Sequence, residues 1–452
     1  MSDKKDDKAI GKKSIEEMLR MLAMGQSLSE PEQKQMADYK FWKTQPVARL
    51  DEKVDQEGEI NVGKTPADVP AEPLPLLADF EWVTMDLTDA AETKQVYELL
   101  YGHYVEDQDA TFRFAYSAEF FDWALKPPGW RRDWHVGVRV KASGKLVAFI
   151  SAVPATLSVR DTEMKAVEIN FLCIHKKLRA KRLAPVLIRE ITRRVNRQNI
   201  WQALYTVGKV LPSPVTTCRY YHRPLNWPNL LDVGFSVLPQ GKTKAQMVAK
   251  YTIGLETKTP GWRTAIKKDI PQMKELFDRY QSRLELVQHF TEEELEHMLI
   301  DPHDTEKVVH CYVSETEGRI TDFVSFYLLP FSVLDNATHE KLGVAYLFYY
   351  ASEAGLDKPR FDPAGTKALA DRLKLLVGDC LVVCKGLGVD VFNAVSSQDN
   401  ALFLQDLKFG GGDGFLNFYL FNYKAFPIAG GIDEKTKEAD VVKRSAVGVV
   451  ML

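Results

Sequence analysis

Two long stretches of the chain repeat the same order of apolar and polar positions. In the first, residues 90–101 have the spacing of an amphipathic helix, and HVGVRV and LVAFISAV alternate as the two strands of a hairpin joined by KASGK. The extended run AVEINFLCI, the amphipathic helix APVLIREITRRVNRQ and the strand WQALYTV follow. This pattern predicts an α/β unit with a hairpin, a central strand and a packed helix.

The same order returns further along the chain. Helices are predicted over 272–284 and 292–299, then a hairpin turning at ETEGR, the strand VAYLFYYAS, a long helix over 367–385 and the strand DVFNAVS. SGKLVAFIS (143–151) and EGRITDFVS (317–325) share a glycine, a basic residue, an aliphatic residue, a phenylalanine and a serine in register. We therefore predict two similar halves in one continuous body, because no flexible linker separates them.

Four segments follow from this pattern. Residues 1–37 are polar apart from SIEEMLRMLAMG, where Ser14 and Glu17 make a capping box, and are predicted to be a mobile arm with one short helix. Residues 38–78 hold an aromatic cluster and a proline-containing run. The two halves are then assigned to 79–240 and 241–452.

Composition excludes several classes of protein. Hydrophobic residues at 45% and charged residues at 27% are ordinary globular values, and a net charge of −3 gives no general attraction to nucleic acid or an anionic membrane. The start lacks the apolar core of a signal peptide, and no stretch approaches the roughly 18 apolar residues of a membrane span, so we expect a cytoplasmic protein. Five scattered cysteines predict reduced core thiols, and no metal site is expected, because zinc-ligand spacing is absent from the sequence.

The stretch EINFLCIHKKLRAKRLAPVLIREITRRVN carries the first candidate chemistry. A predicted buried strand runs into a basic turn and then into a helix, so backbone N–H groups and a positive helix end converge there. Such a junction binds phosphate. For a lone basic run, a solvated turn or a nuclear-localisation segment is the better interpretation; the position after an apolar strand is what favours a phosphate site.

This layout resembles the acetyl-CoA-dependent N-acetyltransferase superfamily, whose pyrophosphate loop opens a helix with the pattern Arg/Gln-x-x-Gly-x-Gly/Ala. Residues 179–184 lie on that pattern with Arg182 where glycine is expected, which argues against an ordinary acetyltransferase. The match becomes specific for the glycylpeptide N-tetradecanoyltransferase (N-myristoyltransferase) family, because YKFWKTQPV, YVEDQDATFRFAYS, YYHRPLN, KFGGGDGFLNFYLFNY and GVVML also resemble its motifs, in order, over 39–452. The resemblance implies an α+β fold in which two N-acetyltransferase-like halves form one saddle-shaped body around a largely antiparallel sheet.

The resemblance also implies an activity: transfer of the tetradecanoyl (myristoyl) group from myristoyl-CoA, a co-substrate, to the N-terminal glycine of cytosolic proteins, without an acyl-enzyme. It assigns the base to the terminal carboxylate of Leu452 and the oxyanion hole to the backbone N–H groups of Phe171 and Leu172. An α-ammonium group must lose a proton before it attacks a thioester, and burial within SAVGVVML would raise the pKa of an α-carboxyl. Read from the residues alone, Phe171 and Leu172 fit a strand core equally well, and the apolar end fits an edge strand or a motif captured by a partner.

The same resemblance implies which residues contact the co-substrate. YKFW folds over the CoA moiety, although an aromatic latch tying the arm to the body is an equally good interpretation of that cluster. The implied set is Tyr39, Lys40, Phe41, Trp42, Asn170, Phe171, Leu172, Cys173, Ile174, Arg179, Ala180, Lys181, Arg182, Leu183, Ala184 and Pro185.

A groove for the acceptor peptide is implied as well. Its set is Tyr104, Val105, Glu106, Asp107, Asp109, Phe112, Phe114, Asn170, Thr206, Tyr220, His222, Ser325, Tyr349, Asn393 and Asp413. Acidic VEDQD would attract basic residues of a substrate, but a short acidic run is usually a solvated loop. His222 fits a second proton relay or a hydrogen-bonded structural histidine. GGGDG is not a nucleotide loop, because no Lys-Ser or Lys-Thr follows it.

Two other functions stay open from the sequence. One is a short-chain N-terminal acetyltransferase, and the other a non-catalytic acyl-CoA-binding scaffold with a docking C-terminus. Cys173 lies at the candidate junction, but no histidine partner can be argued from spacing, so a core thiol is the better interpretation. The partners we expect are myristoyl-CoA and glycine-start peptides and proteins, with no nucleic acid and no membrane span, bound by a monomer.

Overall fold

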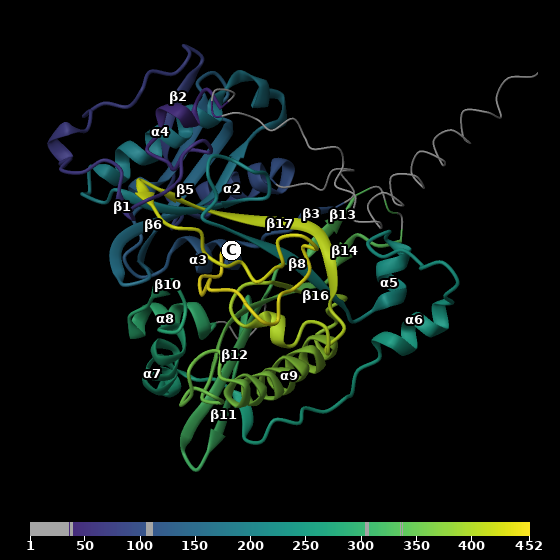
Figure 1. The fold of residues 1–452 in the computed structure, drawn as a ribbon. Coiled ribbons are helices and arrows are strands. Elements are labelled where there is room, and N and C mark those ends of the chain that lie inside the picture. The colour runs from purple at the N-terminus through teal and green to yellow at the C-terminus, as the bar shows by residue number, and fades with distance from the viewer. Residues whose placement is uncertain (1–35, 37–38, 105–111, 303–306, 335, 337) are drawn as a thin grey trace, which may run out of the picture.

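The computed structural model describes residues 36, 39–104, 112–302, 307–334, 336 and 338–452. Within them a 13-stranded sheet runs through both halves of the chain (Figure 1). In spatial order its strands are β2 (Phe80–Thr84), β4 (His135–Val140), β5 (Leu146–Val159), β6 (Thr162–Ile174), β7 (Gln202–Val207), β17 (Gly410–Phe421), β8 (Thr216–Pro224), β16 (Val391–Val395), β15 (Val344–Ser352), β12 (Arg319–Leu328), β11 (Val309–Thr316) and β9 (Trp262–Thr264), with β10 (Leu286–His289) beside β5.

The strand order has an internal two-fold symmetry. β2-β4-β5-β6-β7-β17 mirrors β9-β11-β12-β15-β16-β8, and the two sets meet where β17 pairs with β8. β17 comes late in the chain but pairs with β7 of the first half, whereas β8 comes early and pairs with β16 of the second. Among the described strands, only the β6–β7 and β15–β16 pairs are parallel. The predicted continuous body around a largely antiparallel sheet is therefore confirmed.

Helices occupy matching places in the two halves. Two helices follow the first strand of each half, and one helix joins the parallel strands. The helices are α2 (Ala90–His103), α3 (Ala118–Leu125) and α4 (Leu183–Asn196) in the first half, α7 (Ile270–Gln281), α8 (Glu292–Leu299) and α9 (Pro363–Gly386) in the second, and α5 (Trp227–Asp232) and α6 (Lys244–Tyr251) between them. Two small sheets complete the fold: β1 (Gly58–Glu59) with β18 (Tyr423–Lys424), and β3 (Phe112–Phe114) with β13 (Phe331–Val333) and β14 (Lys341–Leu342).

Local capping explains where α8 and α9 begin. α8 starts after Thr291, which makes a capping box with Glu294, and covers the predicted range. α9 starts at Pro363 because the side chain of Asp362 accepts the N–H of Gly365. The sequence analysis began this helix four residues later, at 367, because it followed the apolar spacing and overlooked the Asp-Pro start.

The core accounts for the cysteines and for the end of the chain. All five cysteines lie in the described part of the chain, where they are buried and free.

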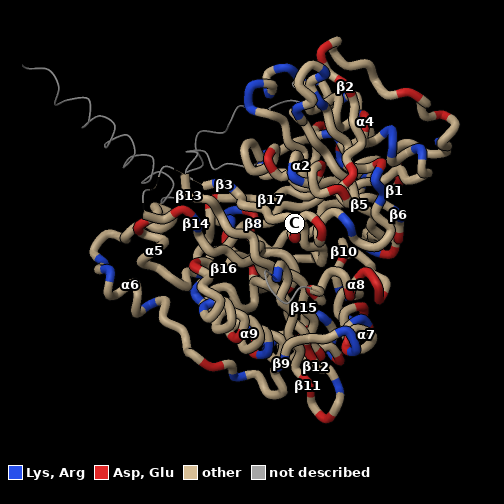
Figure 2. The backbone as a smooth tube through the Cα atoms, turned by 180° about the vertical axis from the view of Figure 1, so that it is seen from behind, with Lys and Arg blue, Asp and Glu red and all other residues tan. Residues whose placement is uncertain are grey.

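The C-terminus lies near the middle of the molecule in both views, and basic and acidic residues are interspersed over the fold (Figures 1 and 2). None of the helices in the described segments has the length and apolar character needed to span a membrane.

Candidate active site

β6 is irregular at the two residues implied to form the oxyanion hole. In its pairing with β5, Cys173 lies opposite Phe149 and Asn170 opposite Ser151, so Phe171 and Leu172 together face one residue. Phe171 has a φ of 56°, in the left-handed region that bulky residues rarely adopt. A bulge of this kind disrupts the ladder and re-aims backbone groups.

Aromatic side chains enclose this bulge. The Phe171 ring lies 5.8 Å from Tyr104, 5.4 Å from Tyr116 and 5.6 Å from Phe121, between ring centroids. Burial raises the pKa of the Tyr104 phenol, and a hydrogen bond from the backbone N–H of Phe171 acts against that shift. The Phe171 N–H therefore lies near the phenol oxygen of Tyr104.

The last eight residues run through the core. The Gln398 N–H donates to the Val447 carbonyl at 2.7 Å, and the Val450 N–H donates to the Tyr349 hydroxyl at 3.1 Å. Val449 to Met451 are buried and Leu452 is half-buried. The tail makes two isolated bridges, between Val447 and Leu286 and between Ser445 and Gly430, rather than the terminal edge strand considered from the sequence. Because the tail is buried, little of its surface is exposed for a partner protein to bind, as the captured-motif interpretation would need.

A buried ion network holds the start of this tail. Arg444 is 1% exposed and pairs with Asp399 at 2.9 Å, and the Tyr280 hydroxyl donates to the same carboxylate at 2.5 Å. Arg360 also pairs with Asp399, at 3.2 Å, and donates to the Ser445 carbonyl. Sequence reasoning missed this network because its members are far apart in the chain.

Leu452 and Glu168 line one cavity of about 30 Å³. Glu168 is 6% exposed, and its Oε1 accepts a hydrogen bond from Asn170 Nδ2 at 2.5 Å. Burial raises the pKa of Glu168 to about 7, although the bond from Asn170 acts against the shift. Sequence reasoning missed Glu168 too; the available signal was a carboxylate inside the apolar run AVEINFLCI.

The basic junction has the predicted order of strand, turn and helix. The unpredicted feature is the backbone conformation of Arg182. β6 ends in a 3₁₀ turn, Lys176–Lys181, and α4 begins after Arg182. Arg182 has a φ of 57°, so it adopts the left-handed conformation for which glycine is favoured. Its side chain and those of Arg179 and Lys181 are exposed, whereas Leu183 is buried and anchors the helix start. Ala180 is exposed, and Ala184 and Pro185 are half-buried.

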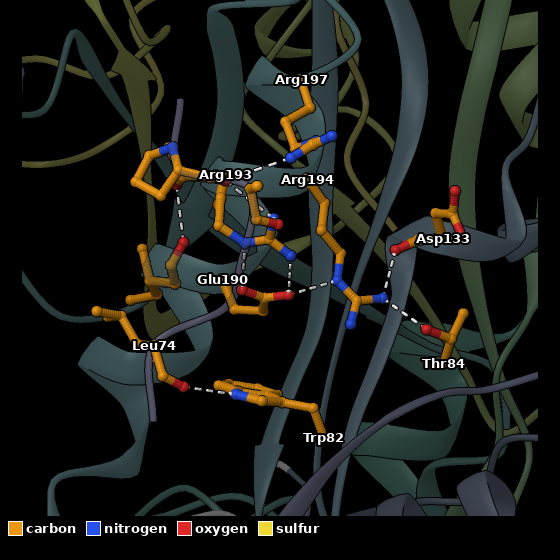
Figure 3. A network of polar contacts seen from close by, with 12 residues as sticks. Leu74, Trp82, Thr84, Asp133, Glu190, Arg193, Arg194 and Arg197 are labelled. Carbon is orange, nitrogen blue, oxygen red and sulfur yellow. Dashed lines mark hydrogen bonds and ion pairs between the residues drawn. The ribbon is translucent and has the colours of Figure 1, made fainter. Parts of the chain in front are cut away.

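The far end of α4 is held by a second network (Figure 3). Buried Glu190 pairs with Arg193 at 2.8 Å and with Arg194 at 2.6 Å. Burial opposes ionisation of Glu190, but the two guanidinium groups lower its pKa. Arg194 also donates to Thr84 Oγ1 at 2.8 Å, and Arg193 to the Ala71 carbonyl at 2.7 Å. These contacts fix α4 against β2 and the preceding segment, and so fix its N-terminus.

The YKFW segment lies on the body of the first half. The Trp42 ring stacks on Tyr205 at 5.6 Å between centroids, and the Arg189 guanidinium lies 5.6 Å from the Phe41 ring. The Tyr39 hydroxyl donates to the Val210 carbonyl at 3.3 Å, while Lys40 is exposed. The segment thus meets both β7 and α4, as a latch or a CoA cover would.

The implied peptide-groove residues fall into an aromatic wall and a polar pair. Phe112 and Phe114 on β3 pack against Phe331, with centroids 6.1 and 5.1 Å away. His222 Nδ1 and Asn393 Oδ1 lie 2.7 Å apart across β8 and β16, and burial lowers the pKa of His222. This histidine is therefore mostly neutral at pH 7.

The remaining implied residues are more scattered. Ser325 is fully buried and its hydroxyl donates to the Tyr349 carbonyl at 2.6 Å, so it supports the sheet. Thr206 and Tyr220 are half-buried on β7 and β8, and Asp413 is exposed on β17. Ile174 ends β6 half-buried. Val105, Glu106, Asp107 and Asp109 lie outside the described residues.

Comparisons with known proteins match this arrangement along the chain. A family model for the N-terminal domain of myristoyl-CoA:protein N-myristoyltransferase matches 59–218, and the model for its C-terminal domain matches 232–450. The glycylpeptide N-tetradecanoyltransferase of Candida albicans is 59% identical over 445 residues, covering 97% of each chain, and that of Saccharomyces cerevisiae is 54% identical over 456 residues, covering 99% of each.

Solved structures agree with these relatives. The crystal structure of Saccharomyces cerevisiae N-myristoyltransferase with bound myristoyl-CoA has a TM-score of 0.90 and 56% identity, covering 92% of this chain and 100% of that one. A second yeast structure with bound myristoyl-CoA has a TM-score of 0.91 and 54% identity, covering 97% and 99%. The family models, the relatives and the fold therefore agree that this chain belongs to the N-myristoyltransferase family.

Proposed function

We propose that this chain transfers the myristoyl group from myristoyl-CoA to the N-terminal glycine of peptides and proteins, with the Leu452 carboxylate as base. The observation that carries this is a chain end enclosed by the core: Leu452 is half-buried, packs on a hydrophobic cluster that also contains Phe171, and lines a cavity with Glu168 of β6. Two structures of the Saccharomyces cerevisiae relative with bound myristoyl-CoA support the choice of acyl donor.

The terminal carboxylate removes a proton from the glycine ammonium group. In water an α-ammonium of pKa about 8 and an α-carboxyl of pKa about 3.5 differ by roughly 6 kcal/mol, which makes this transfer unfavourable. Val450 and Met451 are 8% and 7% exposed, and their apolar surroundings raise the proton affinity of the neighbouring carboxylate. The buried tail thus turns a weak base into a useful one.

The neutral amine then attacks the thioester carbonyl carbon. A C–N bond forms, the C–S bond breaks, and CoA leaves through its sulfur. The backbone N–H groups of Phe171 and Leu172 stabilise the negative charge on the carbonyl oxygen, and removing one such donor typically lowers the rate by about 10²–10³. The left-handed φ of Phe171 supports this role, because it turns the bulge out of the ladder.

Transfer is direct rather than through an acyl-cysteine. Cys173 is the thiol nearest the bulge in sequence, but it is 2% exposed and burial raises its pKa to about 12. The thiolate needed for covalent catalysis is therefore scarce at pH 7.

The CoA phosphates bind at the start of α4. Arg179, Lys181 and Arg182 supply charge there, the helix end supplies N–H groups, and YKFW covers the nucleotide. Burying the acyl chain contributes about 0.8 kcal/mol per methylene, so a fourteen-carbon chain binds far more tightly than acetyl.

The direct experiment is mass spectrometry of a glycine-start peptide incubated with this chain and myristoyl-CoA or acetyl-CoA. The proposal predicts a myristoylated product, little acetylation, and no product from the matched alanine-start peptide. Faster acetyl transfer would favour a short-chain acetyltransferase, and tight acyl-CoA binding without product would favour a scaffold.

A further inference from the structure

Glu168 is a carboxyl group that the proposed chemistry leaves without a task. It lies on β6, 6% exposed, and the donor to its carboxylate is the side chain of Asn170. Among the described residues, no lysine, arginine or histidine forms an ion pair with it. Burying a charge without a cation is unfavourable, so its retention beside the bulge calls for a reason.

The cavity that Glu168 lines also receives the chain end. Its volume of about 30 Å³ is enough for one water molecule, and Gln288 and Tyr349 add polar groups to its wall. Leu452, which carries the terminal carboxylate, and Glu294 line the cavity with Glu168, and Glu168 is close enough to the phenols of Tyr349 and Tyr327 to raise their pKa values. Leu452 and Glu168 thus share one small cavity that has a few polar groups on a largely apolar wall.

Transfer needs somewhere for a proton to go. A glycine ammonium group that becomes an amide loses two protons; one ends on the CoA sulfur, and the other must leave the site. Because burial raises the pKa of Glu168 to about 7, a proton passed from an α-carboxyl to Glu168 moves to a group that holds it more strongly.

We propose that Glu168 receives the proton that the Leu452 carboxylate removes from the substrate ammonium group, through water in their shared cavity, and later releases it to solvent. An N–H bond breaks at the ammonium group and an O–H bond forms at Leu452. That O–H bond breaks in turn as a new one forms at Glu168, which regenerates the base. This inference rests on the proposed function.

The variant that isolates proton acceptance is Glu168→Gln, because it keeps the volume and an oxygen that accepts from Asn170 Nδ2. With saturating myristoyl-CoA and glycine-start peptide, kcat at pH 7 should fall at least about tenfold, within the usual size of general-base effects. The wild-type kcat should fall as pH drops below 7, because a protonated Glu168 accepts nothing. The kcat of the variant should not show this fall below pH 7, while the variant binds myristoyl-CoA as the wild type does.

Glu294→Gln is the matched control. Glu294 lines the same cavity, but its Oε2 accepts the Thr291 N–H in the α8 capping box and its side chain is half-exposed. Its substitution should leave kcat within about twofold of the wild type. An equal loss in both variants would mean that cavity polarity, not Glu168, matters, and would overturn the proposal.

Each other outcome is also decisive. A Glu168→Gln enzyme with the wild-type kcat and pH profile overturns the relay, as does loss confined to Glu168→Ala, which would make Glu168 only a positioning residue for Asn170. If Glu168→Gln fails to fold, a wild-type kcat that stays constant from pH 6 to 8 overturns it without the variant. A wild type that transfers no myristoyl group refutes the proposed function instead.

Discussion

Two bulky residues at the candidate site adopt backbone conformations that favour glycine. Phe171 has a φ of 56° and Arg182 a φ of 57°, and left-handed geometry costs such residues roughly 1–2 kcal/mol each. The sequence suggested that Arg182 departs from the superfamily pattern, whereas the backbone follows the pattern and only the side chain differs. Such strain persists where the surrounding structure fixes it, as the buried Leu183 and the Glu190 network fix α4.

Two substitutions of Arg182 separate the effect of backbone strain from the effect of the guanidinium charge. Arg182→Ala keeps the unfavourable φ and removes the guanidinium, whereas Arg182→Gly removes both. We expect both variants to bind myristoyl-CoA about tenfold more weakly, because a charge-assisted contact to phosphate is lost. Chemical denaturation should show Arg182→Gly more stable than Arg182→Ala by about 1 kcal/mol. Greater stability of the alanine variant would contradict the left-handed assignment.

Glu168 makes stability depend on pH. Burial raises its pKa from 4.5 to about 7, so folding favours the protonated form, and stability falls as pH rises from 4.5 through 7. Glu168→Gln lacks this titration. Urea denaturation should therefore show the free energy of unfolding of the variant rising relative to that of the wild type as pH increases from 4.5 to 7. The total rise should be about 3 kcal/mol, with little further change above pH 8. A constant difference from pH 4.5 to 8 would contradict the burial of an uncompensated carboxylate.

At the scale of elements, the tail is held by its neighbours rather than by strand pairing. Besides the Asp399 network, the Gly448 N–H donates to the Leu286 carbonyl at 2.7 Å, and Gln281 Nε2 donates to the Gly448 carbonyl at 3.4 Å. Apolar composition predicted that the chain end is buried, but the partners come from β10, α7 and the segment after β16. Contacts of such sequence separation leave no local pattern to recognise.

Gly448 is where this packing is tightest. A Cβ there would lie 1.9 Å from Gln281 Oε1 and 2.9 Å from Leu284 Cδ1, so Gly448→Ala must displace either these buried side chains or the tail. We expect kcat for peptide myristoylation to fall about tenfold or more, because misplacing a catalytic group by about 1 Å has effects of this size. Myristoyl-CoA binding, measured by calorimetry, should be nearly unchanged.

Gly386→Ala at the end of α9 is the control, since a Cβ there meets nothing within 4 Å. It should retain wild-type turnover. If Gly448→Ala is as active as this control, the tail does not need its observed path for catalysis.

At the scale of the whole molecule, each half has a bulge close to the end of the aligned repeat, and the two bulges differ in use. In the first half, Phe171 and Leu172 face one residue of β5; in the second, Phe348 and Tyr349 face Ser325 alone. The serines that close the two aligned repeats make matching bonds, Ser151 to the Asn170 carbonyl at 2.9 Å and Ser325 to the Tyr349 carbonyl at 2.6 Å. One bulge thus faces the proposed reaction, and the other presents the tyrosine that holds the tail.

The sequence predicted the parts of this design that local pattern controls. Hairpins, helices and the order of both halves followed from periodicity, and the short repeat marked the symmetry. The central exchange of β17 and β8 was not predicted, because GGGDG reads as a loop and pairing between distant strands leaves no local signal. Family motifs indicated most candidate residues, but Glu168 and the Asp399 network emerged only when distant elements were brought together.

The central claim is that the terminal carboxylate itself is the base, and the most direct test replaces it with a primary carboxamide at Leu452. The amide keeps the size and burial of the tail but accepts no proton at neutral pH. We predict that this chain binds myristoyl-CoA like the wild type, while single-turnover myristoylation of a glycine-start peptide slows by about 10²–10⁴. Myristoylation at the wild-type rate by the carboxamide would contradict the account.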